Sequence, residues 1–214
     1  FNTDPASPSA GCDRLIVSQS FFQSPEFQLK GLYAFLFYRV AFDRRPEYAE
    51  IVSDMRSVTG QTPEEVFAKR ARLAETFTQR PEFKSRYDGL NNRQYVEALL
   101  GRYGLSLINT PDPASPDTGQ QRPLAQADLV RWLDDGTLTR AQVLRALVQS
   151  SEVDSAEYLG AFVAMQYYGY LRRSPEQSGY DAWLRVIRQD PNNIRIMVDG
   201  FMNSVEYRLR FGRQ

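Results

Sequence analysis

The feature that most constrains the fold of this chain is a short pattern that occurs four times. The pattern has an apolar residue, one intervening residue, an amide, Ser or Arg, any residue, Glu, and an aromatic or apolar residue. Its copies read FFQSPEF (21–27), FTQRPEF (77–83), LVQSSEV (147–153) and FMNSVEY (201–207). Their glutamates are separated by 56, 70 and 54 residues, and the long interval contains 15 residues, 109–123, that are rich in Pro, Asp, Ser and Gly. This near-regular spacing predicts a degenerate array of helical repeat units with one inserted loop.

The recurring pattern has a local explanation at the junctions between helices. A Ser side chain at a junction accepts a hydrogen bond from the orphan backbone amides of the next helix and serves as its N-cap. The Glu two positions later falls in the first turn, where the helix dipole stabilises negative charge. We therefore expect structural caps that need no partner, and no pair of catalytic carboxylates. The predicted caps are Ser24, Glu26, Glu82, Ser150, Glu152, Ser204 and Glu206.

The rest of the chain also indicates helices. Apolar residues recur at three- and four-residue spacing in 32–42, 66–77, 95–103, 143–148 and 158–171, and no long window alternates with period two. The segments TPEE (62–65) and TRAQ (139–142) resemble capping boxes, and Gly136 suits the left-handed position after a helix. The predicted fold class is all-α, with units of a short helix plus a long helix packed into one compact bundle-like domain.

The predicted organisation has four parts. We expect a linker or tail in 1–11, N-terminal helical units in 12–108, the inserted Pro-rich loop in 109–123, and a C-terminal helical unit in 124–214. The start of the chain, rich in Pro, Ser and Ala, is interpreted as a linker or the end of a processed fragment. The longest apolar stretch, 31–42, is interrupted by Arg39 and is shorter than the roughly 20 residues of a membrane helix, so we expect no membrane span.

The composition excludes several classes of chemistry. The 214 residues include no histidine and one cysteine, Cys12, which excludes His-based nucleophilic sites, His-ligated zinc or haem, and a disulfide within the chain. Cys12 is interpreted as a buried thiol, as the partner of a cysteine outside this segment or, least favoured because no histidine can lower its pKa, as a reactive nucleophile. Equal counts of 26 basic and 26 acidic residues give no net field to attract nucleic acid. We expect no cofactor, no metal site and no nucleic-acid partner.

One cluster of aromatic residues and arginines is a candidate binding surface. The aromatic-rich helix around 162–171 ends in arginines, as does the helix that ends near Arg44. Aromatic residues at this spacing are typical of a core, and arginines near a helix end can bind exposed carbonyls or carboxylates of the adjoining unit. The alternative is a surface that stacks on sugar rings or contacts a protein partner. The residues of this alternative are Tyr167, Tyr168, Tyr170, Arg172 and Arg173.

The same region resembles a known family. The segment FVAMQYYGYLRRSPEQSGYDAWL, which begins at Phe162, is followed by the helix that ends in FMNSVEY. Together they resemble the bacterial domain of unknown function 4214, whose unit has an aromatic residue, a Leu-x-Arg-x-Pro-Asp turn, then Gly and Trp. The matching positions are Tyr168, Leu171, Arg173, Pro175, Gly179 and Trp183, with Glu176 in place of the usual Asp. The two earlier units lack this Gly and Trp, so the resemblance covers one clear unit and two eroded ones.

The resemblance implies a context more than a mechanism. Such domains are modules of secreted or cell-surface bacterial proteins, with the periplasm as the alternative location, and their unit is similar to the linker domain of phycobilisomes, an assembly element. The family offers no catalytic residues to carry over. We therefore expect a non-enzymatic helical interaction or scaffold module with protein partners, which uses the loop 109–123 and the tyrosine and arginine helix end.

Three alternatives to this function stay open from the sequence. The first is an assembly or linker subunit of a membrane-associated complex, for example a photosynthetic one. The second is a glycan-binding surface module, which requires exposed coplanar aromatic rings. The third and least favoured is a carboxylate-dependent glycoside hydrolase, which requires two carboxyl groups roughly 5 to 9.5 Å apart in a cleft.

Overall fold

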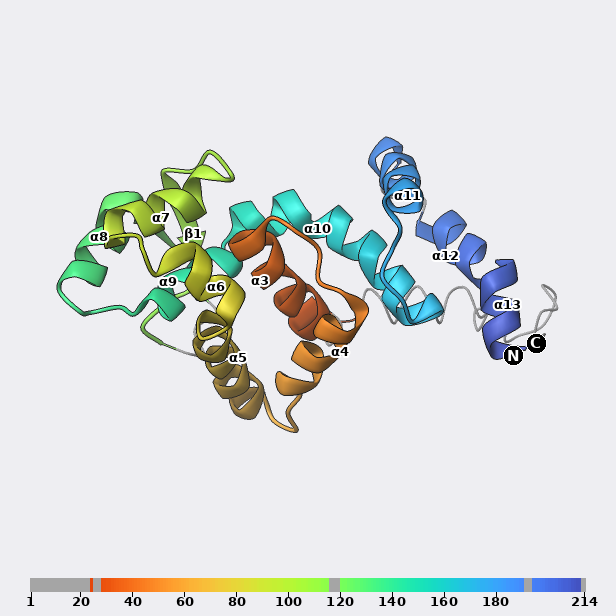
Figure 1. The fold of residues 1–214 in the computed structure, drawn as a ribbon, viewed down its shortest axis with the longest axis horizontal. Coiled ribbons are helices and arrows are strands. Elements are labelled where there is room, and N and C mark those ends of the chain that lie inside the picture. Colours follow the sequence, from red (N-terminus) through yellow and green to blue (C-terminus); the bar gives the residue numbers. More distant parts are fainter. Residues whose placement is uncertain (1–23, 25–27, 116–119, 191–193, 213–214) are drawn as a thin grey trace. The chain divides into compact units, whose positions relative to one another are not determined.

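The computed structural model describes residues 24, 28–115, 120–190 and 194–212 (Figure 1). Helices dominate these residues, so the predicted all-α class is confirmed, with a small two-stranded sheet in addition. The chain divides into two compact units, which we call the central unit (33–158) and the terminal unit (1–32 with 159–214). The predicted boundaries at 12, 109 and 124 do not coincide with this division. The tail 1–11, Cys12 and Glu26 lie outside the described residues.

The central unit is built from helices and one hairpin. Its elements are α3 (Tyr33–Phe42), α4 (Tyr48–Ser57), α5 (Pro63–Thr78), α6 (Pro81–Tyr87), α7 (Asn92–Gly101), β1 (Leu107–Thr110), β2 (Arg122–Ala125), α8 (Gln126–Asp134), α9 (Arg140–Val148) and the first half of α10 (Ser151–Gln166).

Helix α3 forms the core of the central unit because it is apolar on all sides. All of its residues except Arg39 are buried, and it packs against α4 and α9 (Figure 1). Phe77 of α5 completes this core. Its ring lies 5.2 Å from the rings of both Tyr38 and Phe42, edge-on to the first and stacked on the second. Within the described ranges, no helix combines the length and apolar character needed to cross a lipid bilayer.

Local signals set the helix ends of the central unit. The Thr62 hydroxyl accepts a hydrogen bond from the Glu65 amide at 3.2 Å, with Pro63 at the first helical position of α5. Thr139 and Gln142 form the predicted reciprocal capping box at the start of α9. Gly136 adopts a φ of 79°, the left-handed conformation predicted for it. These ends were therefore readable from the sequence.

The segment predicted to be an inserted loop, 109–123, begins and ends in the two strands of a β-hairpin. Strands β1 and β2 pair antiparallel, with Asn109 opposite Pro123 and Thr110 opposite Arg122. The Thr110 hydroxyl, which is buried, donates to the Ala146 carbonyl of α9 at 2.7 Å and ties the hairpin to the helices. The interpretation of 109–123 as one solvated loop is therefore wrong at both of its ends.

The terminal unit consists of helical segments. Its elements are the π-helical turn η2 (Gln28–Leu32), the second half of α10, the π-helical turn η3 (Tyr167–Leu171), α11 (Gln177–Gln189), α12 (Ile194–Met202) and α13 (Val205–Phe211). Phe201 is the centre of its aromatic core. The rings of Tyr167, Tyr170 and Trp183 lie 4.8, 5.9 and 5.7 Å from the Phe201 ring.

Candidate functional site

The predicted tyrosine and arginine surface is a buried cluster. Tyr167, Tyr168 and Tyr170 are 3%, 5% and 7% exposed, because η3 turns them toward the core of the terminal unit. The alternative of an exposed aromatic surface is therefore wrong, and the interpretation of these aromatic residues as core describes the three rings. Arg172 is exposed at the end of η3, with its guanidinium 4.9 Å from the Phe211 ring.

Arg173 links three segments of the terminal unit through its guanidinium group. Its Nε and Nη2 donate to the two carboxylate oxygens of Glu206 at 2.7 and 2.8 Å. Its Nη1 donates to the Ser174 carbonyl at 3.0 Å and to the Glu176 carboxylate. The guanidinium carbon lies 5.2 Å from the centre of the Tyr167 ring. We call Arg173 with Glu176 and Glu206 the Arg173 clamp.

The central unit contains a matching arrangement around Arg44. Its Nε and Nη2 donate to the two carboxylate oxygens of Glu82 at 3.0 and 2.7 Å. Its Nη1 donates to the Arg45 carbonyl at 3.1 Å and to Glu50 at 2.8 Å, and its guanidinium carbon lies 5.1 Å from the centre of the Tyr38 ring. We call Arg44 with Glu50 and Glu82 the Arg44 clamp.

The two clamps occupy equivalent places in the sequence. Each arginine follows a residue with left-handed backbone, Asp43 (φ 52°) or Arg172 (φ 49°), which turns the chain at the end of an aromatic helix. Each is followed by a residue that contributes its carbonyl and then by Pro-Glu. Each binds a junction glutamate, 38 or 33 residues further along the chain. Bidentate Arg–carboxylate pairs fix geometry as well as contributing energy, so both clamps hold a helix junction in place.

The third described junction glutamate, Glu152, binds an amide residue instead of an arginine. Its carboxylate accepts the backbone N–H of Asn109 at 2.9 Å and the side-chain amide of Asn109 at 2.7 Å. Asn109 lies opposite Pro123, which has no N–H to donate, and the Asn109 N–H bonds to Glu152 and not to β2. Asn109 and Pro123 are therefore a non-hydrogen-bonded pair of the two strands. Glu152 thus occupies the open edge of β1, where an unpaired donor would invite another strand.

Two of the predicted serine caps, Ser150 and Ser204, have the geometry of N-caps. The Ser204 hydroxyl accepts from the Tyr207 amide at 3.0 Å and donates to the Phe201 carbonyl at 2.8 Å. The Ser150 hydroxyl, which is buried, donates to the Leu147 carbonyl at 2.7 Å and lies 3.4 Å from the Val153 amide. Ser24 is half-buried in a bend.

The glutamates do more than the sequence predicted. Glu82 and Glu206 lie in the first turns of α6 and α13, as expected, but each also has a partner far along the chain, and so does Glu152. The prediction that these glutamates need no partner is therefore wrong. The partners are different for each glutamate, so the described junction carboxylates do not converge on one site.

The electrostatics of the clamps favour ionised carboxylates. The hydrogen bonds from Arg173 hold the pKa of Glu206 below its ordinary value of 4.5. Burial is the largest single influence on the pKa of Glu176 and would raise it, but the hydrogen bond from Arg173, a backbone hydrogen bond and the charge of Arg173 together lower it. Glu50 follows the same balance beside Arg44. A glycosidase acid needs a raised pKa, which is the opposite of the direction found for Glu50, Glu176 and Glu206.

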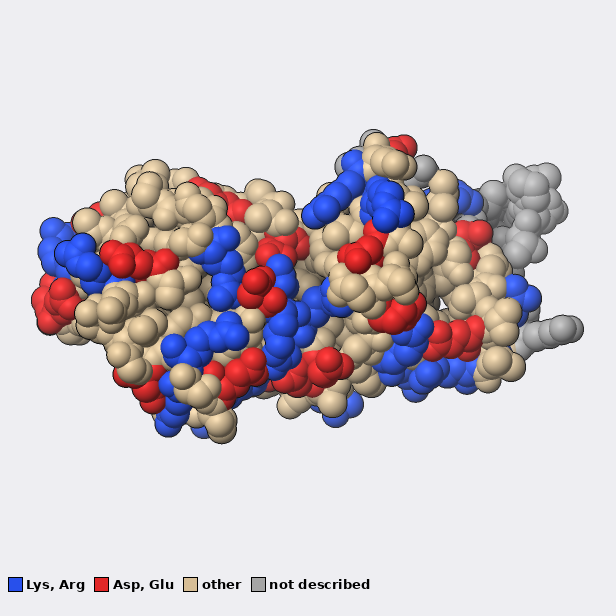
Figure 2. Space-filling model, turned by 45° about the horizontal axis from the view of Figure 1, so that its top comes forward, with Lys and Arg blue, Asp and Glu red and all other residues tan. Residues whose placement is uncertain are grey.

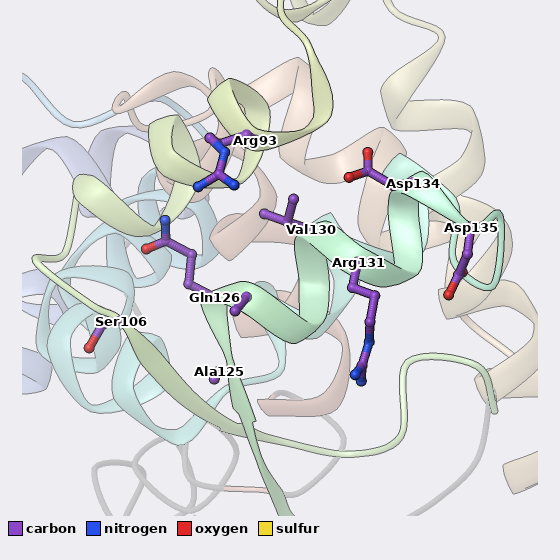
Figure 3. A pocket seen from close by; sticks show the side chains of 9 residues that line it. Arg93, Ser106, Ala125, Gln126, Val130, Arg131, Asp134 and Asp135 are labelled. Atoms are coloured by element: carbon purple, nitrogen blue, oxygen red, sulfur yellow. The ribbon is translucent and has the colours of Figure 1, made fainter.

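A pocket of about 750 Å³ lies in the central unit where α7 faces β2 and α8 (Figure 3). Ala125, Ala127 and Val130 supply an apolar part of the lining, and Asp134 and Asp135 lie toward the end of α8.

The polar groups at the α7 end of the pocket are unengaged. The side chains of Arg93, Ser106 and Gln126 make no hydrogen bond to any described residue, and Figure 3 shows Arg93 and Gln126 on facing sides of the pocket. No sequence pattern predicts this pocket, because its lining comes from three separate segments without a motif.

The remaining chemistry of the described residues is sparse. No group of three or more His, Cys, Asp or Glu side chains is arranged there to hold a metal ion. On the face shown in Figure 2, basic and acidic side chains are interleaved. Comparison of the chain with family models, with curated proteins and with solved structures gave no match. The resemblance to the bacterial family therefore stays an expectation from the residues alone.

Proposed function

We propose that this chain is a non-enzymatic helical interaction module of an exported bacterial protein or large assembly, and that it contacts a protein partner through the pocket between α7 and α8. The proposal keeps the predicted class of function but moves the contact surface. The proposed contact surface is no longer the tyrosine and arginine helix end but the base of the hairpin with the adjoining helices α7 and α8.

The observation that carries the proposal is the contrast between engaged and unengaged polar groups. In the two clamps, each arginine binds two carboxylates and a backbone carbonyl, which leaves little capacity for a ligand. Arg93, Ser106 and Gln126 keep their donors and acceptors unengaged beside an apolar surface. An apolar patch with a polar rim, arginine included, is the usual composition of a protein–protein contact.

The alternatives have less support. Glycan binding depended on exposed coplanar rings, and Tyr167 and Tyr170 are buried. The hydrolase requires two carboxyl groups roughly 5 to 9.5 Å apart in a cleft, and its acid needs a raised pKa. The pKa of Glu176 and Glu206 in the Arg173 clamp, and of Asp135 in the pocket, is lowered. Export and a role as an assembly or linker subunit rest on the family resemblance, and the repeat array rests on the sequence pattern together with the two equivalent clamps.

Site-specific photo-crosslinking tests the proposal. A benzophenone side chain is placed at Gln126 in the pocket, or at Arg72, an exposed residue of α5, as the matched control. In extracts of the source organism we expect the Gln126 probe to give a discrete protein adduct that the Arg72 probe does not give.

Competition then tests whether the adduct depends on the pocket. Unlabelled wild-type protein should compete for the adduct, and Arg93→Glu should not. Arg93 is exposed and makes no hydrogen bond, ion pair or ring contact with a described residue, so this change should alter stability by less than about 0.5 kcal/mol. Identical adducts from both probes, or equal competition by Arg93→Glu, would refute the contact surface.

A further inference from the structure

Two arginines and a tyrosine converge inside the central unit, away from the pocket and the clamps. Arg70 belongs to α5, Arg145 belongs to α9, and these helices pack against each other, while Tyr33 begins α3. The Arg70 guanidinium carbon lies 4.0 Å from the centre of the Tyr33 ring, and the Tyr33 hydroxyl donates to the Arg70 carbonyl at 2.8 Å. Burial raises the pKa of Tyr33, and the charges of both arginines oppose it, so both lie within electrostatic reach of the hydroxyl.

The two guanidinium groups have no counter-ion among the described residues. Arg145 is only 5% exposed and Arg70 is half-buried, yet no described carboxylate lies within ion-pair distance of either. Glu75 and Asp112 act on Arg145 only at longer range, and Asp112 forms its own ion pair with Arg122 at 2.8 Å. Buried charges in proteins are normally paired, so two unpaired cations in one cluster are an exception that requires an explanation.

The hydrogen-bond donors of these arginines are also incompletely used. The Nη2 group of Arg145 donates to the carbonyls of Pro113 and Ser115 at 2.6 and 3.0 Å, but these acceptors carry no charge. The Nε atoms of both Arg70 and Arg145 are buried and have no acceptor. Burial without an opposite charge lowers the pKa of both arginines, which agrees with the lack of a counter-ion. An orphan buried donor commonly marks an ion or water that completes the site.

We propose that Tyr33, Arg70 and Arg145 form a binding site for a small doubly charged oxyanion, a free phosphate or sulfate ion. Two positive charges match a dianion, and the two orphan Nε–H groups supply donors for separate oxygens. The Tyr33 hydroxyl supplies a third donor when its hydrogen bond to the Arg70 carbonyl is replaced by one to the anion. Arg70 is half-buried although its Nε atom is buried. This site is independent of the proposed protein contact.

Anion-dependent unfolding tests the site with an internal control. The chain has two tryptophans, Trp132 in the central unit and Trp183 in the terminal unit, so variants that keep only one of them report on the units separately. Urea unfolding is followed while phosphate or sulfate replaces chloride at constant ionic strength. At an anion concentration 100 times its Kd, a ligand that binds only the folded state shifts the folding equilibrium by about 100-fold. We expect a saturable shift in the Trp132 signal alone.

Variants on one helix separate binding from a general salt effect. Sulfate and phosphate stabilise most proteins without saturation, and that effect would appear in both tryptophan signals. Arg70→Gln should abolish the saturable shift, whereas Arg72→Gln, at an exposed position of the same helix, should retain it. Phosphate binding to the folded wild-type protein, measured by titration calorimetry, requires no variant to fold. No calorimetric binding, or an equal shift in Arg70→Gln and Arg72→Gln, would overturn the proposal.

Discussion

Replacing Tyr38 by phenylalanine tests a buried polar network in the core of the central unit. The Tyr38 hydroxyl donates to Asp54 at 2.7 Å and accepts from Arg80 Nη1 at 2.6 Å, while Arg80 Nη2 donates to the other Asp54 oxygen at 2.6 Å. Tyr38 and Asp54 are 1% and 5% exposed. Phenylalanine keeps the edge-on contact with Phe77, so Tyr38→Phe removes the hydroxyl and little else.

The expected loss of stability follows from the two broken hydrogen bonds. Hydrogen bonds to charged groups contribute about 1.5 to 3 kcal/mol each. The Arg80 side chain is 30% exposed, so water replaces part of its lost bond, whereas the Asp54 side chain is 7% exposed and loses its partner almost completely. We expect Tyr38→Phe to lower the free energy of unfolding of the central unit by about 2 to 3 kcal/mol.

Urea unfolding in a Trp183→Phe background measures this loss, because Trp132 then reports the central unit alone. The midpoint should fall by roughly 1 M for a typical dependence on urea. Tyr158→Phe is the matched control, since the Tyr158 hydroxyl makes no hydrogen bond to a described residue. A shift for Tyr38→Phe no larger than that for Tyr158→Phe would refute the reasoning.

Three further predictions test other parts of the structure. A Cβ at Gly200 would lie 2.7 Å from the Trp183 ring, so Gly200→Ala should destabilise the terminal unit by about 1 to 2 kcal/mol in urea unfolding. A Cβ at Gly101 meets open space, so the control Gly101→Ala should stabilise the central unit by about 0.5 to 1 kcal/mol. Glu152→Ala removes the acceptor of the Asn109 N–H, and should speed hydrogen exchange of that amide and cost about 1 to 2 kcal/mol. The carboxyls of the Arg173 clamp have lowered pKa values in the folded state, so their contribution to the free energy of unfolding is present above pH 4.5 and should disappear as the pH falls below it. When urea unfolding is measured across that pH range, Glu206→Gln should lose less stability than the wild-type protein.

The elements that the sequence predicted are those with strong local signals. Helix α3 has a continuous apolar run, and the starts of α5 and α9 have complete capping residues. Helix α4 was missed because its sequence shows little apolar periodicity, and one of its two buried residues is the charged Asp54. The hairpin was missed because each strand has four residues and the intervening sequence is rich in turn residues.

The site required information that local patterns do not contain. A tyrosine is buried as readily as a phenylalanine when its hydroxyl finds an acceptor, as Tyr87 does at the Ala41 carbonyl and Tyr95 at the Arg140 carbonyl. The spacing of the aromatic residues at 167–170 is typical of a core, and they are buried, but spacing alone left an exposed surface as an alternative. The partners of the junction glutamates lie 33 to 43 residues away, beyond the reach of spacing arguments.

The central claim is that the junction glutamates hold the architecture through their distant partners. A double-mutant cycle on Arg173 and Glu206, with Arg173→Met, Glu206→Gln and the double variant followed by Trp183 fluorescence in urea, measures this coupling directly. The pair is bidentate and about one third exposed, so we predict a coupling of about 1 to 1.5 kcal/mol, above the usual range for surface pairs. The Lys69–Glu65 pair, a single ammonium–carboxylate contact followed by Trp132, should show a clearly smaller coupling. Equal coupling in the two pairs would contradict the claim.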